Sequence, residues 1–283
     1  MSQADRYFIQ EYSKLINEGF SDKDFEVRPK WEDGTPAHTT KIFGVVRTYD
    51  LEKEFPILTL RTQSFKTAVR EILWLFRDKS NNINDLNAHI WDQWADEKGS
   101  IGKAYGYQLG KKYVYNDNGT YQFMDQVEHL IYKLKNSPMD RRMIVTMWNP
   151  SEELEMHLAP CCYETLWDVT DGKLNMTLIQ RSGDLVAAAG AGGFNDIEYA
   201  LLVHMVAREC NLIPGKFIHY INNLHIYDRH MDLMPKIAFN TKYPAPTLWI
   251  NQEKTSIKDM TENDFKLIDY KSTKLEEKIE IAV

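Results

Sequence analysis

A β-hairpin in the middle of the chain constrains the fold more than any other feature. Residues 163–169 and 173–180 both alternate in polarity, which is the pattern of strands that bury one face. Asp171-Gly172 lies between them and suits a tight two-residue turn. The second strand is therefore predicted to belong to an antiparallel hairpin and not to a βαβ unit.

The hairpin bears on the glycine-rich segment that follows it. Gly190-Ala191-Gly192-Gly193 precedes a predicted helix, an order that is also found in dinucleotide-binding folds. Asn195 stands where the third glycine of that fingerprint would be, and the preceding strand lies in a hairpin. We therefore interpret these glycines as residues that bring the backbone close to a ligand or turn a tight corner.

Residues 64–78 have the periodicity of a helix. Phe65, Val69, Ile72 and Phe76 form one apolar stripe at helical spacing. Glu71 lies off that stripe, so periodicity alone predicts a solvent-exposed glutamate. A short strand is predicted over residues 143–148.

The most regular helical pattern covers residues 194–211. Phe194, Ile197, Leu201 and Met205 would form its buried stripe. Asn195 is followed three residues later by Glu198, which matches a capping box, so a structural role as N-cap is predicted for Asn195.

Length and charge bound the class of protein. The 283 residues show no linker or repeat and are predicted to form a single domain, residues 1–283. A net charge of −7 argues against general nucleic-acid binding. The three cysteines are odd in number and match no zinc spacing, and the N-terminus has no signal peptide pattern. A reduced, cytoplasmic protein without a metal site is expected.

Two short motifs carry the chemistry. Leu158-Ala159-Pro160-Cys161-Cys162 supplies a thiol, and Gln180-Arg181-Ser182-Gly183-Asp184 supplies a guanidinium beside a carboxylate. A fixed positive charge favours the reactive thiolate, and arginine with serine can bind phosphate. Taken singly, the cysteine suits a small buried apolar residue and the arginine a surface ion pair. Together they indicate covalent attack on a phosphorylated substrate.

These motifs belong to an ordered set that resembles thymidylate synthase, in the branch common among Gram-positive bacteria and their phages. The resemblance covers nearly the whole chain. It rests on DGTPAHT at 33–39, EILWLF at 71–76, HIWDQWADEKGSIGKAYGYQLGKK at 89–112, SPMDRRMIVTMWNP at 137–150, LAPCCYETLW at 158–167, QRSGD at 180–184, FNDIEYALLVHMVA at 194–207, HIYDRH at 225–230 and the C-terminal EIAV.

The resemblance implies an α+β fold, a single domain with a mixed β-sheet flanked by helices, that forms a homodimer by sheet-to-sheet packing. It implies reductive methylation of dUMP to dTMP. The donor of the one-carbon unit and of the hydride would be 5,10-methylenetetrahydrofolate. The reaction would pass through a covalent adduct between Cys161 and uracil C6, and it would release dihydrofolate as the second product.

The resemblance also assigns roles to residues that bind and transform dUMP. Cys161 matches the nucleophile, and Glu71 and Tyr105 match proton-handling groups. Asn195 matches the amide that reads the uracil edge. The remaining nucleotide contacts implied are Arg181, Ser182, Asp184, His225 and Tyr227, with Arg141 and Arg142 reaching the phosphate of the partner subunit.

The folate site is implied in the same way. Trp91 and Trp94 match its aromatic wall, and Asp184 matches the carboxylate at the pterin. The other folate residues implied are Leu158, Phe194 and, in the C-terminal tail, Ala282.

Three departures from the family pattern affect this interpretation. Cys162 stands where many members have histidine. Residues 185–194 form a longer, glycine-richer segment than usual beside the folate. The usual phosphate loop is absent near Asp33-Gly34, and either Arg28 or Lys30 could replace it.

Two alternative functions remain open from the sequence. In a dUMP hydroxymethylase of the same fold, water instead of hydride would add to the exocyclic methylene. The altered segment 185–194 is compatible with this alternative. Trp91 and the retained EIAV tail count against it. The second alternative is a regulatory protein that binds nucleic acid and has no catalytic activity. The acidic net charge and the intact set of reactive residues argue against it.

Overall fold

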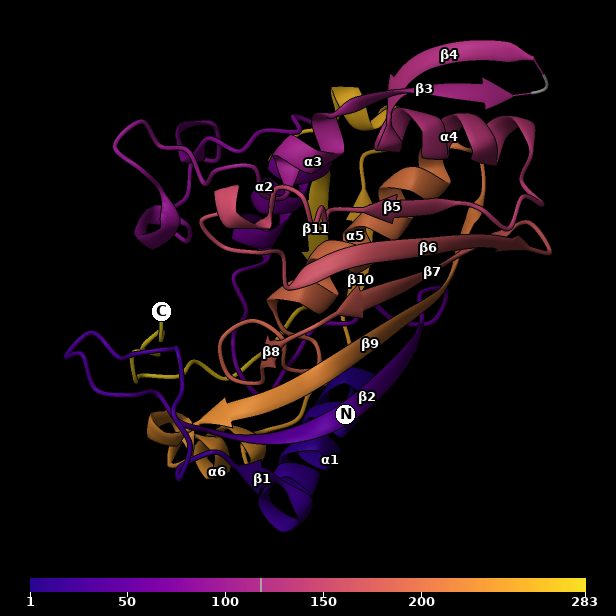
Figure 1. The fold of residues 1–283 in the computed structure, drawn as a ribbon. Helices are drawn as coiled ribbons and strands as arrows, with labels where there is room; N and C mark the ends of the chain where they lie inside the picture. The colour runs from indigo at the N-terminus through magenta and orange to yellow at the C-terminus, as the bar shows by residue number, and fades with distance from the viewer. Residues whose placement is uncertain (118) are drawn as a thin grey trace.

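A mixed β-sheet forms the centre of the molecule. The computed structural model describes residues 1–117 and 119–283 (Figure 1). Within this part, seven strands pair in the order β1-β2-β9-β7-β6-β5, with β8 pairing on β9. The strands of this sheet are β1 (Phe20–Ser21), β2 (Thr39–Asp50), β5 (Ile144–Thr146), β6 (Cys162–Thr170), β7 (Lys173–Gln180), β8 (Gly183–Asp184) and β9 (Ile213–Tyr227).

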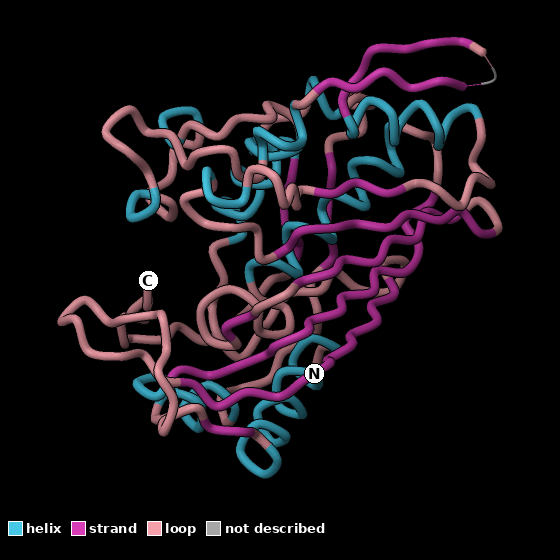
Figure 2. Tube along the Cα trace, in the orientation of Figure 1, coloured by secondary structure: helices cyan, strands magenta, loops and turns pink. Residues whose placement is uncertain are grey.

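Helices cover one face of this sheet and extend past its ends (Figure 2). The α-helices are α1 (Gln3–Glu18), α2 (Phe65–Phe76), α3 (Gly106–Gly110), α4 (Gln126–Asn136), α5 (Phe194–Glu209) and α6 (Leu233–Ala238). Short 3₁₀ turns are η1 (Ile83–Asp85), η2 (Asp92–Trp94), η3 (Glu153–Glu155), η4 (Asp228–His230), η5 (Ile257–Asp259) and η6 (Glu262–Asp264). Two separate ribbons complete the fold, β3 (Lys112–Asp117) with β4 (Thr120–Asp125) and β10 (Thr247–Ile250) with β11 (Phe265–Ile268).

The predicted hairpin is confirmed, but β7 also has a second partner. β6 and β7 pair antiparallel around the turn at Asp171-Gly172, where Asp171 has φ of 51° and Gly172 has φ of 72°. On its other edge β7 pairs with β9 in parallel, and α5 forms the connection between them. The prediction that this strand lies outside a βαβ arrangement is therefore wrong, because a strand can pair on both edges.

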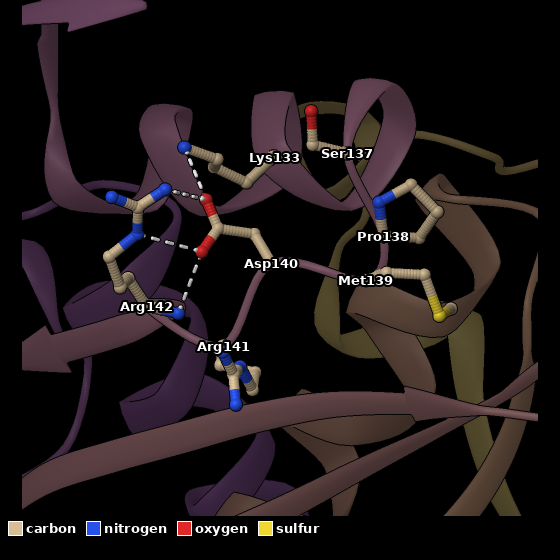
Figure 3. A pocket seen from close by; sticks show the side chains of 7 residues that line it. All are labelled: Lys133, Ser137, Pro138, Met139, Asp140, Arg141 and Arg142. Atoms are coloured by element: carbon tan, nitrogen blue, oxygen red, sulfur yellow. Dashed lines mark hydrogen bonds and ion pairs between the residues drawn. The ribbon is translucent and has the colours of Figure 1, made fainter.

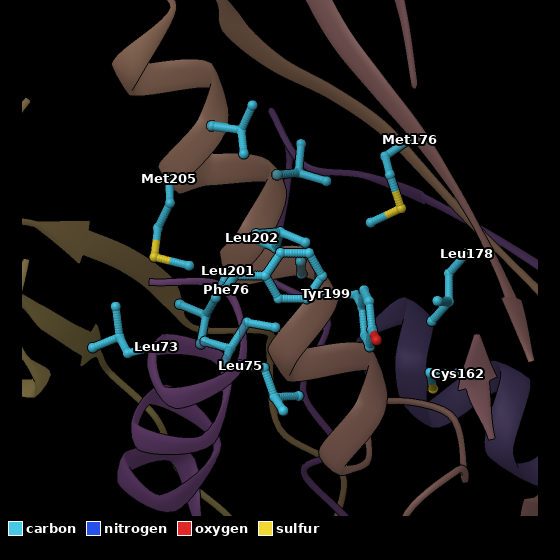
Figure 4. Packing of buried hydrophobic residues seen from close by; sticks show 14 of the residues in the cluster. Leu73, Leu75, Phe76, Cys162, Met176, Leu178, Tyr199, Leu201, Leu202 and Met205 are labelled. Carbon is cyan, nitrogen blue, oxygen red and sulfur yellow. The ribbon is translucent and has the colours of Figure 1, made fainter. Parts of the chain in front are cut away.

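α5 forms the centre of the core. It packs on α2 and against β7 and β9. Its residues are buried on nearly every side, including Tyr199, Leu202 and Met205 (Figure 4). Since α5 is covered by the sheet on one side and by α2 on another, the predicted single stripe underestimates its burial. The predicted mixed sheet with flanking helices is confirmed.

Element boundaries agree closely with the sequence patterns. Helix α2 occupies residues 65–76 of the predicted 64–78, and α5 occupies 194–209 of the predicted 194–211. β5 is shorter than the predicted 143–148. No helix in the described ranges is both long and apolar enough to cross a membrane.

Candidate active site

The two predicted chemical motifs lie side by side. Arg181 Nε donates to the carbonyl of Pro160 at 3.0 Å, and its Nη2 donates to the carbonyl of Ala159 at 2.7 Å. The backbone N–H of Arg181 donates to the carbonyl of Cys161 at 2.9 Å. The arginine therefore holds the turn that presents the thiol at the start of β6.

The electrostatic setting of Cys161 has two opposing parts. Burial raises the pKa of its thiol, whereas the positive charges of Arg181 and Arg28 act to lower it. Burial is the larger effect, so the pKa of the thiol is raised overall, and the lowered pKa expected from a neighbouring positive charge is not found in this structure. The positive charge of Arg28 acts to lower the pKa of both Cys161 and Tyr227, so Arg28 lies near both side chains.

Cys162 is more deeply buried than Cys161 and lacks the effect of the two arginine charges on its pKa. Its side chain is buried in the main core beside Leu178 and Tyr199 (Figure 4). Burial raises the pKa of its thiol far above the usual range. Cys162 is the first residue of β6 and faces the core, whereas Cys161 lies in the bend just before the strand.

Tyr105 contacts the nucleophile segment directly. Its hydroxyl accepts a hydrogen bond from the backbone N–H of Cys161 at 2.9 Å. Tyr105 has φ of 45°, an uncommon conformation for a residue with a side chain, and it precedes Gly106, whose added Cβ would lie 2.0 Å from the carbonyl of Ser80. This constrained turn aims the phenol at Cys161.

Glu71 is buried, so the solvent-exposed position predicted from helical periodicity is wrong. Trp91 Nε1 donates to Glu71 Oε1 at 2.9 Å, and Glu71 Oε2 has no hydrogen-bond partner in the described part of the chain. Burial raises the pKa of this carboxyl to about 7, which the bond from Trp91 partly opposes. A carboxyl with such a pKa can both accept and return a proton near neutral pH.

The aromatic residues predicted for the folate site form a connected cluster. The rings of Trp91 and Trp94 lie 5.3 Å apart, and those of Trp91 and Tyr105 lie 5.1 Å apart. Leu158 and Phe194 are partly buried against the same core. These side chains form an aromatic and apolar cluster next to Tyr105.

Asn195 does not cap its helix, so the predicted capping role is wrong. Gly193 is the N-cap of α5. The side chain of Asn195 is instead held between Gln180 and Glu198. Gln180 Nε2 donates to Asn195 Oδ1 at 3.2 Å, and Asn195 Nδ2 donates to Glu198 Oε2 at 3.2 Å. Gln180 was not predicted as a site residue, although the alternation of β7 places it on the same buried face as Leu178.

Asp184, His225 and Tyr227 meet where β8 and β9 run side by side. Asp184 pairs with His225 in the ladder, and the rings of His225 and Tyr227 lie 5.1 Å apart. Burial raises the pKa of Tyr227 to about 12 and lowers that of His225. Arg61, which was also not predicted as a site residue, is a buried cation whose charge interacts with Asp184.

The C-terminal tail docks against the loop that contains Arg28 and Lys30. Val283 and Lys30 exchange two backbone hydrogen bonds, each 2.9 Å long. His230 Nε2 lies 3.0 Å from the carbonyl of Glu280, whose carboxylate pairs with Arg229. Ala282 lies in this docked tail. The backbone N–H and C=O of Lys30 are both hydrogen-bonded to Val283, as in a pair of β-strands.

Arg141 and Arg142 are not brought together with the other predicted residues. They are exposed and line an open hollow of about 680 Å³ with Lys133, Ser137, Pro138, Met139 and Asp140 (Figure 3). Asp140 pairs with Arg142 at 3.0 Å and with Lys133 at 2.6 Å.

The glycine-rich segment 185–194 is tightly packed. Leu185, Val186, Ala189 and Ala191 are buried in a second core beneath α1 and α6. Gly192 has φ of 67°, and an added Cβ would lie 2.4 Å from the backbone nitrogen of Leu58. Only glycine fits there, which explains part of the glycine content.

Together, these contacts define a site with a thiol, a buried carboxyl, an oriented side-chain amide and an aromatic cluster, a composition typical of enzymes that use nucleophilic and acid–base catalysis. Among the described residues, no group of three or more histidine, cysteine, aspartate or glutamate side chains could hold a metal ion.

Comparison with known proteins agrees with this class. Residues 7–283 match the thymidylate synthase family. Thymidylate synthase 1 of Bacillus subtilis strain 168 is 43% identical over 275 residues, covering 96% of each chain. The thymidylate synthase of Bacillus phage phi3T is 42% identical with the same coverage. The thermostable thymidylate synthase A of Bacillus subtilis superposes with a TM-score of 0.91 at 42% identity over 99% of each chain. The chain belongs to the thymidylate synthase family.

Proposed function

We propose that Cys161 initiates catalysis in this enzyme by adding its sulfur to C6 of the uracil ring of dUMP. The protein is a methyltransferase that converts dUMP to dTMP. The observation that carries the proposal is the contact of Arg181 and Tyr105 with the turn that presents Cys161. The positive charges of Arg181 and Arg28, which act to lower the pKa of this thiol, would favour the thiolate that attacks C6.

The nucleotide phosphate is proposed to bind Arg181 and Ser182. Arg28 joins them, and this choice over Lys30 is supported by the charge interaction of Arg28 with Cys161 and Tyr227. Arg141 and Arg142 of the partner subunit would complete the phosphate site, which accounts for their exposure away from Cys161 in one subunit. His225 and Tyr227 would bind the sugar.

The base would be read by Asn195, with Asp184 nearby. Addition of sulfur to C6 moves charge onto O4 and makes C5 nucleophilic, so an amide N–H at O4 stabilises the enolate. C5 then forms a bond to the donated one-carbon unit and loses its proton. Glu71, supported by Trp91 and Tyr105, is the group proposed to handle these protons.

The cosubstrate is proposed to be 5,10-methylenetetrahydrofolate, which supplies both the methylene group and the hydride. Trp91, Trp94, Leu158 and Phe194 provide the apolar surface for its ring. Asp184 would bind its polar edge, and the tail containing Ala282 would close the site. Excluding water matters because water competes with hydride for the exocyclic methylene.

We also propose a homodimer formed by the outer face of the sheet. Phe43, Val46 and Ile144 on this face are exposed although they lie on strands, Phe43 at 78%. Such an apolar sheet surface suits burial against a second copy. A cytoplasmic location is supported by Cys161, Cys162 and Cys210, which are free thiols in the described residues.

The test is identification of the product. Purified enzyme with dUMP and 5,10-methylenetetrahydrofolate should yield dTMP and an equal amount of dihydrofolate, measured by mass and by absorbance. A nucleotide heavier than dTMP by one oxygen, without dihydrofolate, would replace methylation by hydroxymethylation and leave the Cys161 assignment intact.

A further inference from the structure

Glu198 is a buried acid next to the base-reading amide, and neither the nucleophile nor the proton-handling roles above use it. It is the fifth residue of α5 and is 2% exposed. Its Oε2 accepts from Asn195 Nδ2 at 3.2 Å, and its Oε1 has no hydrogen-bond partner in the part of the chain that is described. Burying a carboxyl costs free energy that ordinary packing does not return, so a specific role is indicated.

The orientation of Asn195 depends on a chain of contacts that begins at a backbone group. Gln180 Nε2 donates to the carbonyl of Ser182 at 2.9 Å, and a carbonyl can only accept. The same NH₂ group therefore also faces Asn195 Oδ1. Gln180 Oε1 lies 2.7 Å from His219 Nε2, where an N–H on the ring would hold the amide in the same sense.

Glu198 holds the opposite end of the Asn195 amide. One N–H of Asn195 is directed to Glu198 and one lone pair of its oxygen is directed to Gln180. One N–H and one lone pair remain on the free edge. That pair matches uracil, which offers O4 as an acceptor beside N3–H as a donor. Cytosine offers the reverse order and would need a rotated amide.

We propose that Glu198 is a specificity-determining residue that acts through Asn195, holding the amide in the orientation that accepts uracil and rejects cytosine. This proposal rests on the proposed binding of dUMP at Asn195. Rotation of the amide would place two NH₂ groups of Gln180 and Asn195 against each other and would break the present contact with Glu198. Glu198 is thus a positioning residue and not a catalytic one.

The test compares variants at position 198 by equilibrium binding of dUMP and dCMP, measured without turnover. Glu198→Leu removes the acceptor and should reduce the preference for dUMP over dCMP by about tenfold, the size expected when one buried hydrogen bond is lost. Glu198→Gln keeps a carbonyl acceptor and should stay within about twofold of the unmodified enzyme. In the folate-dependent assay, Glu198→Leu should raise KM for dUMP more than it lowers kcat.

Glu209→Ala is the matched control. Glu209 lies on the same helix and accepts from the N–H of Ile257 at 2.8 Å, far from the base-reading amide in sequence. It should alter stability without altering the dUMP preference. If Glu198→Leu does not fold, Glu198→Ala carries the same expectation.

An unchanged preference in the apolar variants, with or without lower stability, would overturn the proposal and make Glu198 a purely structural residue. Failure of the unmodified enzyme to form dTMP would instead reject the proposed function, so the two failures are distinguishable.

Discussion

Trp91 donates its indole N–H to the buried carboxyl of Glu71 at a distance of 2.9 Å. This bond joins the aromatic wall proposed for the folate to the group proposed to move protons. One oxygen of Glu71 accepts this bond from Trp91, and the other has no hydrogen-bond partner in the described residues. The bond therefore orients the carboxyl and leaves its second oxygen available for proton transfer.

The first prediction concerns the pH dependence of stability. The pKa of Glu71 is raised from 4.5 to about 7 by burial, so the folded chain retains a proton that the unfolded chain releases. Its stabilising contribution is full below pH 4.5 and is lost as pH rises through 7. The stability of the unmodified protein relative to Glu71→Gln should fall by about 3 kcal/mol between these limits. Urea unfolding at both pH values measures this difference, and Glu18→Gln, at an exposed position, should show no such change.

The second prediction separates the two adjacent thiols. Cys161→Ser should abolish turnover, because a neutral hydroxyl is a poor nucleophile. Cys162→Ser should retain a substantial fraction of activity but lose about 1–3 kcal/mol of stability, since its hydroxyl would be buried. Mass analysis of the adduct with the 5-fluoro analogue of dUMP in the presence of folate decides the assignment. Label on Cys162 would contradict it.

The third prediction concerns shared sites. Arg142→Ala and Cys161→Ser homodimers should each be nearly inactive. After subunit exchange, half of the dimers are mixed, and each has one site with an intact thiol and an intact partner Arg142. Activity should therefore return to about a quarter of the unmodified level, following the statistics of a twofold assembly. Exchange confirmed by mass without recovery of activity would rule out a composite site.

The fourth prediction concerns the C-terminal tail. Deleting Val283 removes both backbone hydrogen bonds to Lys30, so turnover should fall strongly while Tm changes little. Val283→Ala keeps the backbone and serves as the control, with activity near that of the unmodified enzyme. Equal loss in both variants would show that the side chain, and not the backbone pairing, holds the tail.

The fifth prediction concerns a buried ion network behind the site. Arg47 is fully buried and bonds both oxygens of Glu11, at 2.6 and 2.7 Å, and Asp196 at 3.2 Å. Arg47→Met leaves the buried carboxyl of Glu11 without its cationic partner, while Asp196 keeps its bonds from Tyr49 and Gly192, and should cost about 3–5 kcal/mol of unfolding free energy. Lys173→Met breaks an exposed pair with Glu52 and should leave Tm nearly unchanged. Thermal and denaturant unfolding compare the two.

The sequence predicted several features well because they depend on neighbours along the chain. The alternation around Asp171-Gly172 predicted a hairpin whose strands are observed as β6 and β7, since a strand's own residues set its faces. Helix α5 was recognised from its period for the same reason. The proximity of Arg181 to the Cys161 segment followed from motif order and from the family resemblance.

Glu71 shows where this reasoning fails. Periodicity describes only the face that a helix presents to one neighbour, and Glu71 lies off that face. A second neighbour, Trp91, covers it from another part of the chain. The capping role predicted for Asn195 is wrong for the same reason. Its side chain hydrogen-bonds to Gln180, from a distant strand, and to Glu198, and these contacts replace the local capping arrangement.

The sequence by itself determined the β6–β7 hairpin, the helices α2 and α5, and the types of reactive group, because polarity patterns and side-chain chemistry are local properties. Only the tertiary structure decided that β7 pairs in parallel with β9, that Glu71 is buried with a pKa of about 7, and that the amide of Asn195 is held at both ends. Each of these depends on segments distant in sequence, whose burial and hydrogen bonds exist only after the chain has folded.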